Sequence, residues 1–214
     1  MKAVYIFSGL GADHRAFQFI DFSGFDITFI RWVEPAGKES IESYSRRLTE
    51  QIESTRPILI GLSFGGLIAI EVAKFIDTEK IILISSAKTW RGIPFFYRFP
   101  GRLKFHKILP ARLLRKRNIF SNWFFGIKGA RERELLSEIL ADTEPAFLKW
   151  AIDKIVTWRN TQVPENLRHI HGTADRILPV RYVEADIKVA GGGHFMIADK
   201  AKELSDLIRH EIGN

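Results

Sequence analysis

The sequence predicts an α/β fold, with a doubly wound and mostly parallel sheet of about six strands that helices cover on both faces. Three observations favour it. Short apolar runs alternate with segments of helical periodicity, which is typical of parallel sheets. The length of 214 residues, of which 46% are hydrophobic, is ample for one core. A serine between two glycines also stands where one apolar run ends and a helical pattern begins.

The expected strands are short apolar runs, and the expected helices repeat apolar residues every three or four positions. The strands are expected at residues 3–7, 26–30, 58–61, 80–84, 168–171 and 187–190. The helices are expected near residues 14–21, 40–54, 65–76 and 198–212. No internal repeat is visible, so we expect a single domain over residues 1–214, with an insertion at about 90–160 where the alternation stops.

Ser63 lies between Gly61 and Gly65, at the junction of the third strand and the next helix. A serine on such a sharp turn is exposed at the top of the sheet, and glycines on both sides let strand and helix approach closely. The alternative is a turn serine without chemistry. The apolar strand at 58–60 and the helical pattern after the serine favour a nucleophile elbow.

A carboxylate and a histidine follow the last two expected strands. Asp175 lies in the polar loop after the strand at 168–171, and His194 ends the glycine loop after the strand at 187–190. A serine needs a base to remove its proton, and the base needs an acid that orients it. The loop after the strand at 80–84 contains no carboxylate, so Asp175 is the only well-placed acid.

The order Ser63, Asp175, His194 resembles that of the α/β-hydrolase superfamily, and the resemblance covers nearly the whole chain. It implies a sheet that lacks the two leading strands of larger members and has the strand order 2-1-3-4-5-6. It also implies Ser63 as nucleophile, His194 as general base and Asp175 as orienting acid. The other histidines are expected to be structural, and they are His14, His106, His169, His171 and His210.

The same resemblance implies an oxyanion hole built from backbone N–H groups. One belongs to Phe64, which follows the nucleophile, and the other is assigned by position to Leu10 in the loop after the first strand. Many relatives begin this loop with His-Gly, where this chain has Ser8 and Gly9. Because a backbone N–H can donate whatever its side chain, Ser8 and Gly9 at these positions are compatible with an oxyanion hole.

The insertion at about 90–160 stands where the superfamily places a helical lid, and its prolines divide it into several helices. Its aromatic residues are expected to line an acyl pocket. The residues assigned to this pocket are Trp90, Phe95, Phe96, Phe120, Trp123 and Phe124.

The net charge of +7 is concentrated in this lid, because residues 91–131 contain no acidic residue. A solvated surface is one explanation, since charge runs usually cover exposed helix faces. Attraction of an anionic substrate or an anionic membrane surface is another, because basic and aromatic residues together suit an interfacial helix. Nucleic-acid binding is not expected, because the sequence shows no recognised nucleic-acid module.

The sequence thus predicts a serine hydrolase whose substrate is a small-molecule acyl ester or thioester. An acyltransferase, a ligand-binding or signalling protein with negligible turnover, and a membrane-surface adaptor remain alternatives. No cofactor or metal is expected. The chain has no cysteine and no apolar run of the ~20 residues that a membrane span needs, so a cytoplasmic location is the default expectation. The sequence leaves the oligomeric state, the acyl chain and the leaving group undetermined.

Reversing the charges of Arg115, Lys116 and Arg117 to glutamate should weaken binding to anionic vesicles or turnover of anionic substrates. Exposed charges attract over a Debye length of ~10 Å at 0.1 M salt, so the wild-type effect should fade at 1 M. Hydrolysis of a small neutral ester should stay almost unchanged. Vesicle cosedimentation and ester kinetics measure the two effects. Loss of neutral-ester activity in a stable fold would instead place this cluster in the catalytic architecture.

Overall fold

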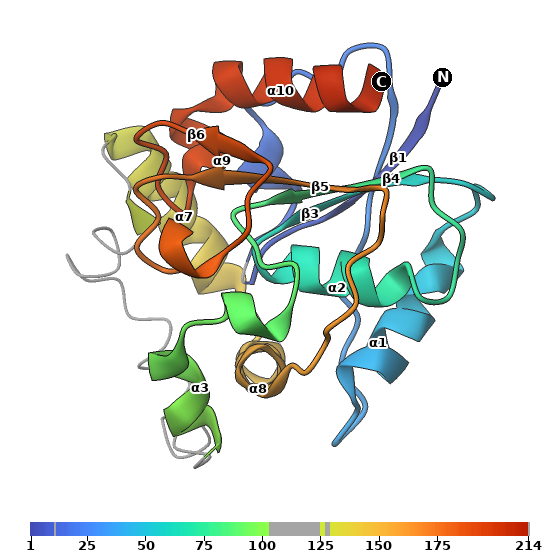
Figure 1. Cartoon of the computed structure of the whole chain (residues 1–214), viewed down its shortest axis with the longest axis vertical. Coiled ribbons are helices and arrows are strands. Elements are labelled where there is room, and N and C mark those ends of the chain that lie inside the picture. The colour runs from blue at the N-terminus through green and yellow to red at the C-terminus, as the bar shows by residue number, and fades with distance from the viewer. Residues whose placement is uncertain (11, 103–124, 127–128, 214) are drawn as a thin grey trace.

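The computed structural model describes residues 1–10, 12–102, 125–126 and 129–213, and its centre is one six-stranded sheet (Figure 1). The strands are β1 (Ala3–Phe7), β2 (Asp26–Phe29), β3 (Ile58–Leu62), β4 (Lys80–Ile84), β5 (Leu167–Gly172) and β6 (Ile187–Val189). All neighbours are parallel, in the order β2-β1-β3-β4-β5-β6. The expected fold class and strand order are therefore confirmed.

Burial along the strands follows their place in the sheet. The central strand β3 is buried at every position, whereas the edge strand β2 alternates between exposed and half-buried residues. A strand covered on both faces consists almost entirely of apolar residues, and a half-covered edge strand alternates. The register, with Val4 opposite Ile58 and Ile58 opposite Lys80, aligns the carboxyl ends of β1, β3 and β4 at one edge.

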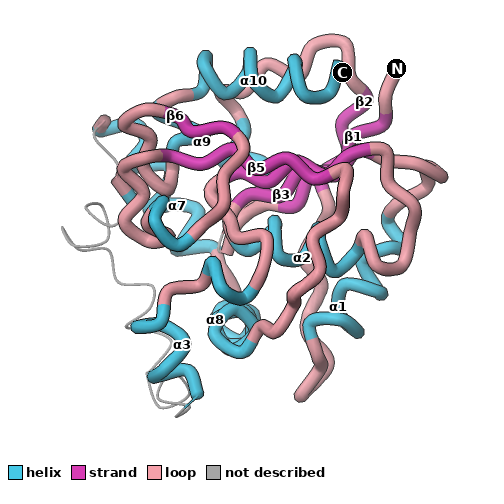
Figure 2. Tube along the Cα trace, in the orientation of Figure 1, coloured by secondary structure: helices cyan, strands magenta, loops and turns pink. Residues whose placement is uncertain are grey.

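Helices cover both faces of the sheet, as Figures 1 and 2 show. On one face lie α1 (Ile41–Leu48), α2 (Phe64–Val72) and α8 (Pro145–Thr157), whose apolar residues form one core with the sheet. On the other face lie α7 (Ala130–Asp142), α9 (Met196–Asp199) and α10 (Ala201–Gly213), which form a second core. The short helix α3 (Phe95–Arg102) contacts α8. Within the described ranges, no helix combines the length and hydropathy of a membrane-spanning segment.

Helix boundaries differ from the sequence prediction at four places. The helix expected at 198–212 is divided at Lys200 into α9 and α10. The helix expected at 14–21 is a 3₁₀ turn, His14–Phe17, in which backbone hydrogen bonds such as Gln18 N to Arg15 O span three residues. Helix α1 ends in another 3₁₀ turn, Thr49–Gln51, after which Ile52 is extended. Helix α2 stops at Val72, where the backbone N–H groups switch to three-residue turns.

A buried carboxylate joins α2 to the segment that follows α8. Glu71 is 1% exposed, and its side chain accepts hydrogen bonds from Trp158 Nε1 at 2.8 Å and from Lys74 Nζ at 2.7 Å. Such a charge is tolerated in a core only when it is paired and hydrogen-bonded. The contact therefore ties the end of α8 to α2.

Glycines at the β3–α2 junction permit contacts that no larger side chain allows. A Cβ atom on Gly61 would lie 2.4 Å from Gly66 Cα, and one on Gly65 would lie 2.2 Å from Phe7 O. These obstacles are backbone atoms, which cannot rotate away. The close packing of β1, β3 and α2 therefore depends on both glycines.

Gly61→Ala should destabilise the protein by about 1–3 kcal/mol or more, because the new methyl group overlaps the backbone of α2. Urea unfolding measures the change. Gly213→Ala is the matched control, since its Cβ would meet nothing within 4 Å. The control should be neutral or slightly stabilising, by less than about 1 kcal/mol. Equal stabilities of the two variants would show that the junction can expand.

Candidate active site

Ser63 occupies a strained backbone conformation between β3 and α2. Its φ of 51° and ψ of −117° lie in a region that non-glycine residues rarely adopt. Its N–H donates to Ile84 O at 2.9 Å, and its carbonyl accepts from Gly66 N at 3.0 Å and from Ser86 Oγ at 2.7 Å. These hydrogen bonds hold the turn in place and leave the Ser63 side chain half-buried at the carboxyl edge of the sheet.

The three side chains that the sequence singled out form one hydrogen-bonded chain. Ser63 Oγ lies 2.9 Å from His194 Nε2, and His194 Nδ1 lies 2.7 Å from Asp175 Oδ2. The loops after β5 and β6 are themselves joined, because Ala174 N donates to Gly192 O at 2.9 Å. The Phe125 ring meets the His194 ring edge-on at 5.8 Å. Loops distant in sequence thus place nucleophile, imidazole and carboxylate within hydrogen-bonding distance.

Asp175 is buried, and its hydrogen bonds stabilise the ionised form of its carboxyl group. Burial alone would raise its pKa, but the positive potential and hydrogen bond of His194, together with His171 and the Leu178 N–H, bring the pKa below its ordinary value. Asp175 Oδ1 accepts from the N–H groups of Ile177 and Leu178, both at 2.8 Å. The carboxylate therefore stays ionised and its orientation is fixed.

Two further histidines, which the sequence predicts to be structural, belong to the hydrogen-bonded surroundings of this carboxylate. His171 Nε2 lies 3.4 Å from Asp175 Oδ2, and His171 Nδ1 lies 3.2 Å from His169 Nε2. Burial lowers the pKa of His169 to about 3 and is also the largest cause that lowers the pKa of His171. Side chains two residues apart on a strand project from the same face of the sheet. This spacing in the sequence could have predicted that the two histidines lie together.

Two backbone N–H groups beside Ser63 have no hydrogen-bond acceptor within the described residues. Phe64 is the first residue of α2, so its N–H has no partner inside the helix. The loop after β1 approaches Ser63 closely, since a Cβ atom on Gly9 would lie 3.5 Å from Ser63 Cβ. The Leu10 N–H in this loop also has no hydrogen-bond acceptor among the described residues. Gly11, next in this loop, lies outside the described residues.

An apolar cavity of about 420 Å³ opens beside Ser63. Its other lining residues come from α2, α3, α8 and the loops after β4 and β5, and they are Phe64, Leu67, Ile93, Tyr97, Ile152, Ile155, Val156, Ile177 and Leu178. Within the described part of the chain, no charged side chain lines it. The cavity therefore suits an uncharged hydrocarbon group next to the serine.

The aromatic residues expected to line a pocket are placed differently. Phe95 and Phe96 are 63% and 46% exposed, and the Trp90 ring carries the Arg98 guanidinium 4.5 Å from its centroid. None of these three aromatic residues lines the cavity beside Ser63, because the turn of α3 directs Tyr97 inward instead. Phe120, Trp123 and Phe124 lie outside the described residues.

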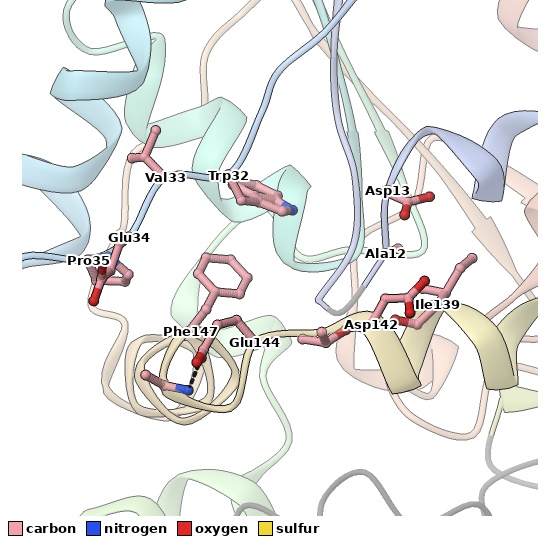
Figure 3. A pocket seen from close by; sticks show the side chains of 12 residues that line it. Ala12, Asp13, Trp32, Val33, Glu34, Pro35, Ile139, Asp142, Glu144 and Phe147 are labelled. Carbon is pink, nitrogen blue, oxygen red and sulfur yellow. Dashed lines mark hydrogen bonds between the residues drawn. The ribbon is translucent and has the colours of Figure 1, made fainter.

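A second cavity of about 400 Å³ is lined by Trp32 and Phe147 (Figure 3), whose rings both contact the Phe64 ring. The Trp32 and Phe147 rings, 5.5 Å apart, form one wall, and Asp13 and Asp142 lie on the opposite side. Ser63 does not line this cavity. No local sequence pattern indicates this cavity, because its walls come from segments more than a hundred residues apart.

No group of three or more His, Asp or Glu side chains within the described ranges has an arrangement that could hold a metal ion. The functional groups that hydrogen bonds join at this edge are the serine, the imidazole and the carboxylate. Together they form an arrangement that can activate a hydroxyl group.

Comparison with known proteins agrees with this architecture. A family model described as "Alpha/beta hydrolase family" matches residues 4–207. A search of curated proteins finds no match. Among solved structures, a thermophilic esterase from Thermogutta terrifontis superposes with a TM-score of 0.74 and 15% identity, over 99% of this chain and 89% of that one.

Two further structures show the range of similar proteins. A bromoperoxidase from Bacillus anthracis has a TM-score of 0.69 and 18% identity, over 100% of this chain and 93% of its own. A lipase-esterase related protein from Clostridium acetobutylicum has a TM-score of 0.71 and 15% identity, over 98% and 93%. At these identities the structural similarities show the fold alone.

The buried histidines should make stability depend on pH. Below the ordinary histidine pKa of 6.5 the unfolded chain binds a proton that native His169, with its pKa of about 3, does not bind. Stability is therefore full above pH 6.5 and falls on acidification, by about 1.4 kcal/mol per pH unit for each such histidine. Asp175 adds a loss of the same sign only below its ordinary pKa of 3.8.

Urea unfolding between pH 4.5 and 6.5 isolates the histidine contribution. His169→Gln should reduce the slope of stability against pH by up to one proton equivalent. A slope that is the same in wild type and His169→Gln would show that His169 is protonated in the native state.

Proposed function

The chain belongs to the alpha/beta hydrolase family. We propose that it cleaves carboxylic esters or thioesters through an acyl-enzyme on Ser63. The hydrogen-bonded chain from Ser63 Oγ through His194 to the buried Asp175 carboxylate is the observation that supports this most directly. A protein that only binds a ligand needs no such chain, so the arrangement favours chemistry over binding alone.

In this mechanism Ser63 Oγ attacks the acyl carbon while His194 Nε2 takes its proton. The tetrahedral oxyanion is stabilised by the N–H groups of Phe64 and Leu10, with the partial positive charge of the α2 amino terminus behind them. His194 then returns the proton to the leaving alcohol or thiol. A water molecule, deprotonated by the same imidazole, attacks the acyl-enzyme and releases the acid and the free serine.

Asp175 has two roles in these steps. Its hydrogen bond from His194 Nδ1 keeps the Nε2 lone pair directed at the serine, and its negative charge stabilises the imidazolium that forms. The two backbone N–H groups on Oδ1 keep the carboxylate from rotating. The acid therefore acts through His194 without contacting the substrate.

The cavity beside Ser63 is proposed as the acyl pocket. Its apolar lining and absence of charged side chains among the described residues favour a neutral hydrocarbon acyl group over a charged one. Ile152, Ile155 and Val156 reach it from α8, so we assign the segment at about 90–160 as a lid within a single domain of residues 1–214. Acyl transfer to an alcohol uses the same acyl-enzyme and remains the alternative outcome.

The lid is also proposed to attract anionic substrates or an anionic surface. Of its basic residues, Arg91 and Arg98 lie over the Trp90 ring and Arg131 over the Phe19 ring. The cluster Arg115, Lys116 and Arg117 lies outside the described residues. The absence of acidic residues from 91–131 is the observation that supports this role.

Ser63 should react covalently with a fluorophosphonate probe, because its hydroxyl is activated by His194. Mass spectrometry of the digested protein locates the adduct. Ser63→Ala should lose the adduct and lower turnover of short and long acyl esters and of an acyl thioester by about 10⁴-fold or more, with the fold retained.

Ser85→Ala is the matched control. Ser85 also has a positive φ, 49°, but it is fully buried and its Oγ has no hydrogen-bond partner among the described residues. This variant should label and turn over like the wild type. Labelling at a residue other than Ser63, or none at all in folded protein, would overturn the proposed function. Faster product formation with an added alcohol than with water would favour acyl transfer.

A further inference from the structure

The proposed mechanism leaves two buried histidines without a role. His169 and His171 are 0% exposed and occupy alternate positions of β5, so both project from the same face of the sheet. Their rings lie 5.0 Å apart at an interplanar angle of 76°. Polar rings buried this deeply must find hydrogen-bond partners or destabilise the core.

The partners form a chain that ends at the candidate acid. His169 Nδ1 lies 3.2 Å from Glu184 O, His169 Nε2 lies 3.2 Å from His171 Nδ1, and His171 Nε2 lies 2.7 Å from Leu178 O. Leu178 N in turn donates to Asp175 Oδ1 at 2.8 Å. One residue, Leu178, thus accepts from His171 through its C=O and donates to Asp175 through its N–H.

Proton counting shows that these contacts cannot all be satisfied at once. Carbonyl oxygens stand at both ends of the pair and only accept, so three hydrogen bonds need three protons. Burial lowers the pKa of both histidines, so the neutral pair carries two protons. One of the three contacts must therefore lack its proton.

The Asp175 carboxylate selects the tautomer of His171. A lone pair on His171 Nε2 would face both Leu178 O at 2.7 Å and Asp175 Oδ2 at 3.4 Å, which is strongly unfavourable. The proton therefore resides on His171 Nε2, and His171 Nδ1 is left as an acceptor for a proton on His169 Nε2. With that proton on His169 Nε2, the contact to Glu184 O, at the other end of the pair, is the one that lacks a proton.

We propose that His171 is a positioning residue for Asp175 and that His169 donates from Nε2 to fix the His171 tautomer, so that this histidine pair orients the same carboxylate oxygen that His194 contacts. The inference rests on the proposed function of the serine, histidine and aspartate. The His171 N–H anchors the Leu178 peptide and partly offsets the carboxylate charge. Because it reduces the negative potential that Asp175 presents to His194, it disfavours premature protonation of the base.

Charged and titratable groups surround this pair on every side. On the catalytic side they are Asp175, His194 and, from α3, Tyr97, whose pKa is raised by burial first and by the Asp175 charge second. On the far side they are Lys88 and Asp186, whose ion pair of 2.9 Å flanks His169. Asp186 Oδ2 also accepts from the His169 backbone N–H at 2.7 Å, which holds this end of the strand.

Two substitutions at one position test the proposal. His171→Phe keeps a ring but removes the donor, whereas His171→Gln keeps an N–H near the position of Nε2. We expect His171→Phe to lower kcat/KM for esters and the rate of fluorophosphonate labelling of Ser63 by about 10- to 100-fold, with KM nearly unchanged, as for groups that orient a functional histidine from behind. The acid limb of its pH profile should move to higher pH. His171→Gln should restore most of the wild-type kcat/KM and labelling rate, together with the wild-type pH profile. His14→Phe should match the wild type.

Nitrogen NMR of the imidazoles in the wild-type protein provides a measurement that does not depend on a folded variant. At neutral pH the proton should reside on Nε2 of both His169 and His171, with both Nδ1 atoms unprotonated. A proton on His171 Nδ1 would overturn the proposal. Labelling of His171→Phe at the wild-type rate with an unchanged pH profile would also overturn it. If the wild-type protein itself fails to label at Ser63, the proposed function fails, and the imidazole tautomers still report on the pair.

Discussion

The backbone of Ser63 is the constraint on which the other parts of the site depend. A φ of 51° is costly for serine, and it persists because Ile84 and Ser86 hold both sides of its peptide and because Gly61 and Gly65 let α2 lie directly on the strands. The turn starts α2 immediately at the next residue, so one free N–H and the positive helix end face the serine. The loop after β1 and the loops after β5 and β6 then need only reach this one point.

Charge at the site is controlled by burial and by specific hydrogen bonds together. The Asp175 carboxylate is removed from water, which alone would favour its neutral form, and its contacts with His194 and with two backbone N–H groups outweigh that effect. The buried histidines of β5 stay neutral, so they contribute oriented N–H groups without adding a charge. An ionised carboxylate can therefore lie inside an apolar core next to the His194 imidazole.

Helix α8 connects the site to the rest of the molecule. Its side chains Ile152, Ile155 and Val156 cover the cavity beside Ser63, while Phe147, in its first turn, lines the second cavity. The buried Glu71–Trp158 hydrogen bond ties the end of this helix to α2, the helix that begins at the serine. Movement of α8 would therefore change both cavities together, whereas the serine, histidine and carboxylate rest on the sheet.

The strand alternation, the turn at Ser63 and the grouping of Asp175 and His194 at one sheet edge could be predicted from the sequence. These features follow from local rules: glycine sterics act within a few residues, and parallel strands bring their carboxyl ends together. The inward position of Tyr97 beside the exposed Phe96, and the contact of His171 with Asp175, became evident only in the folded structure. Those outcomes depend on contacts between segments distant in the chain, whose packing no local pattern encodes.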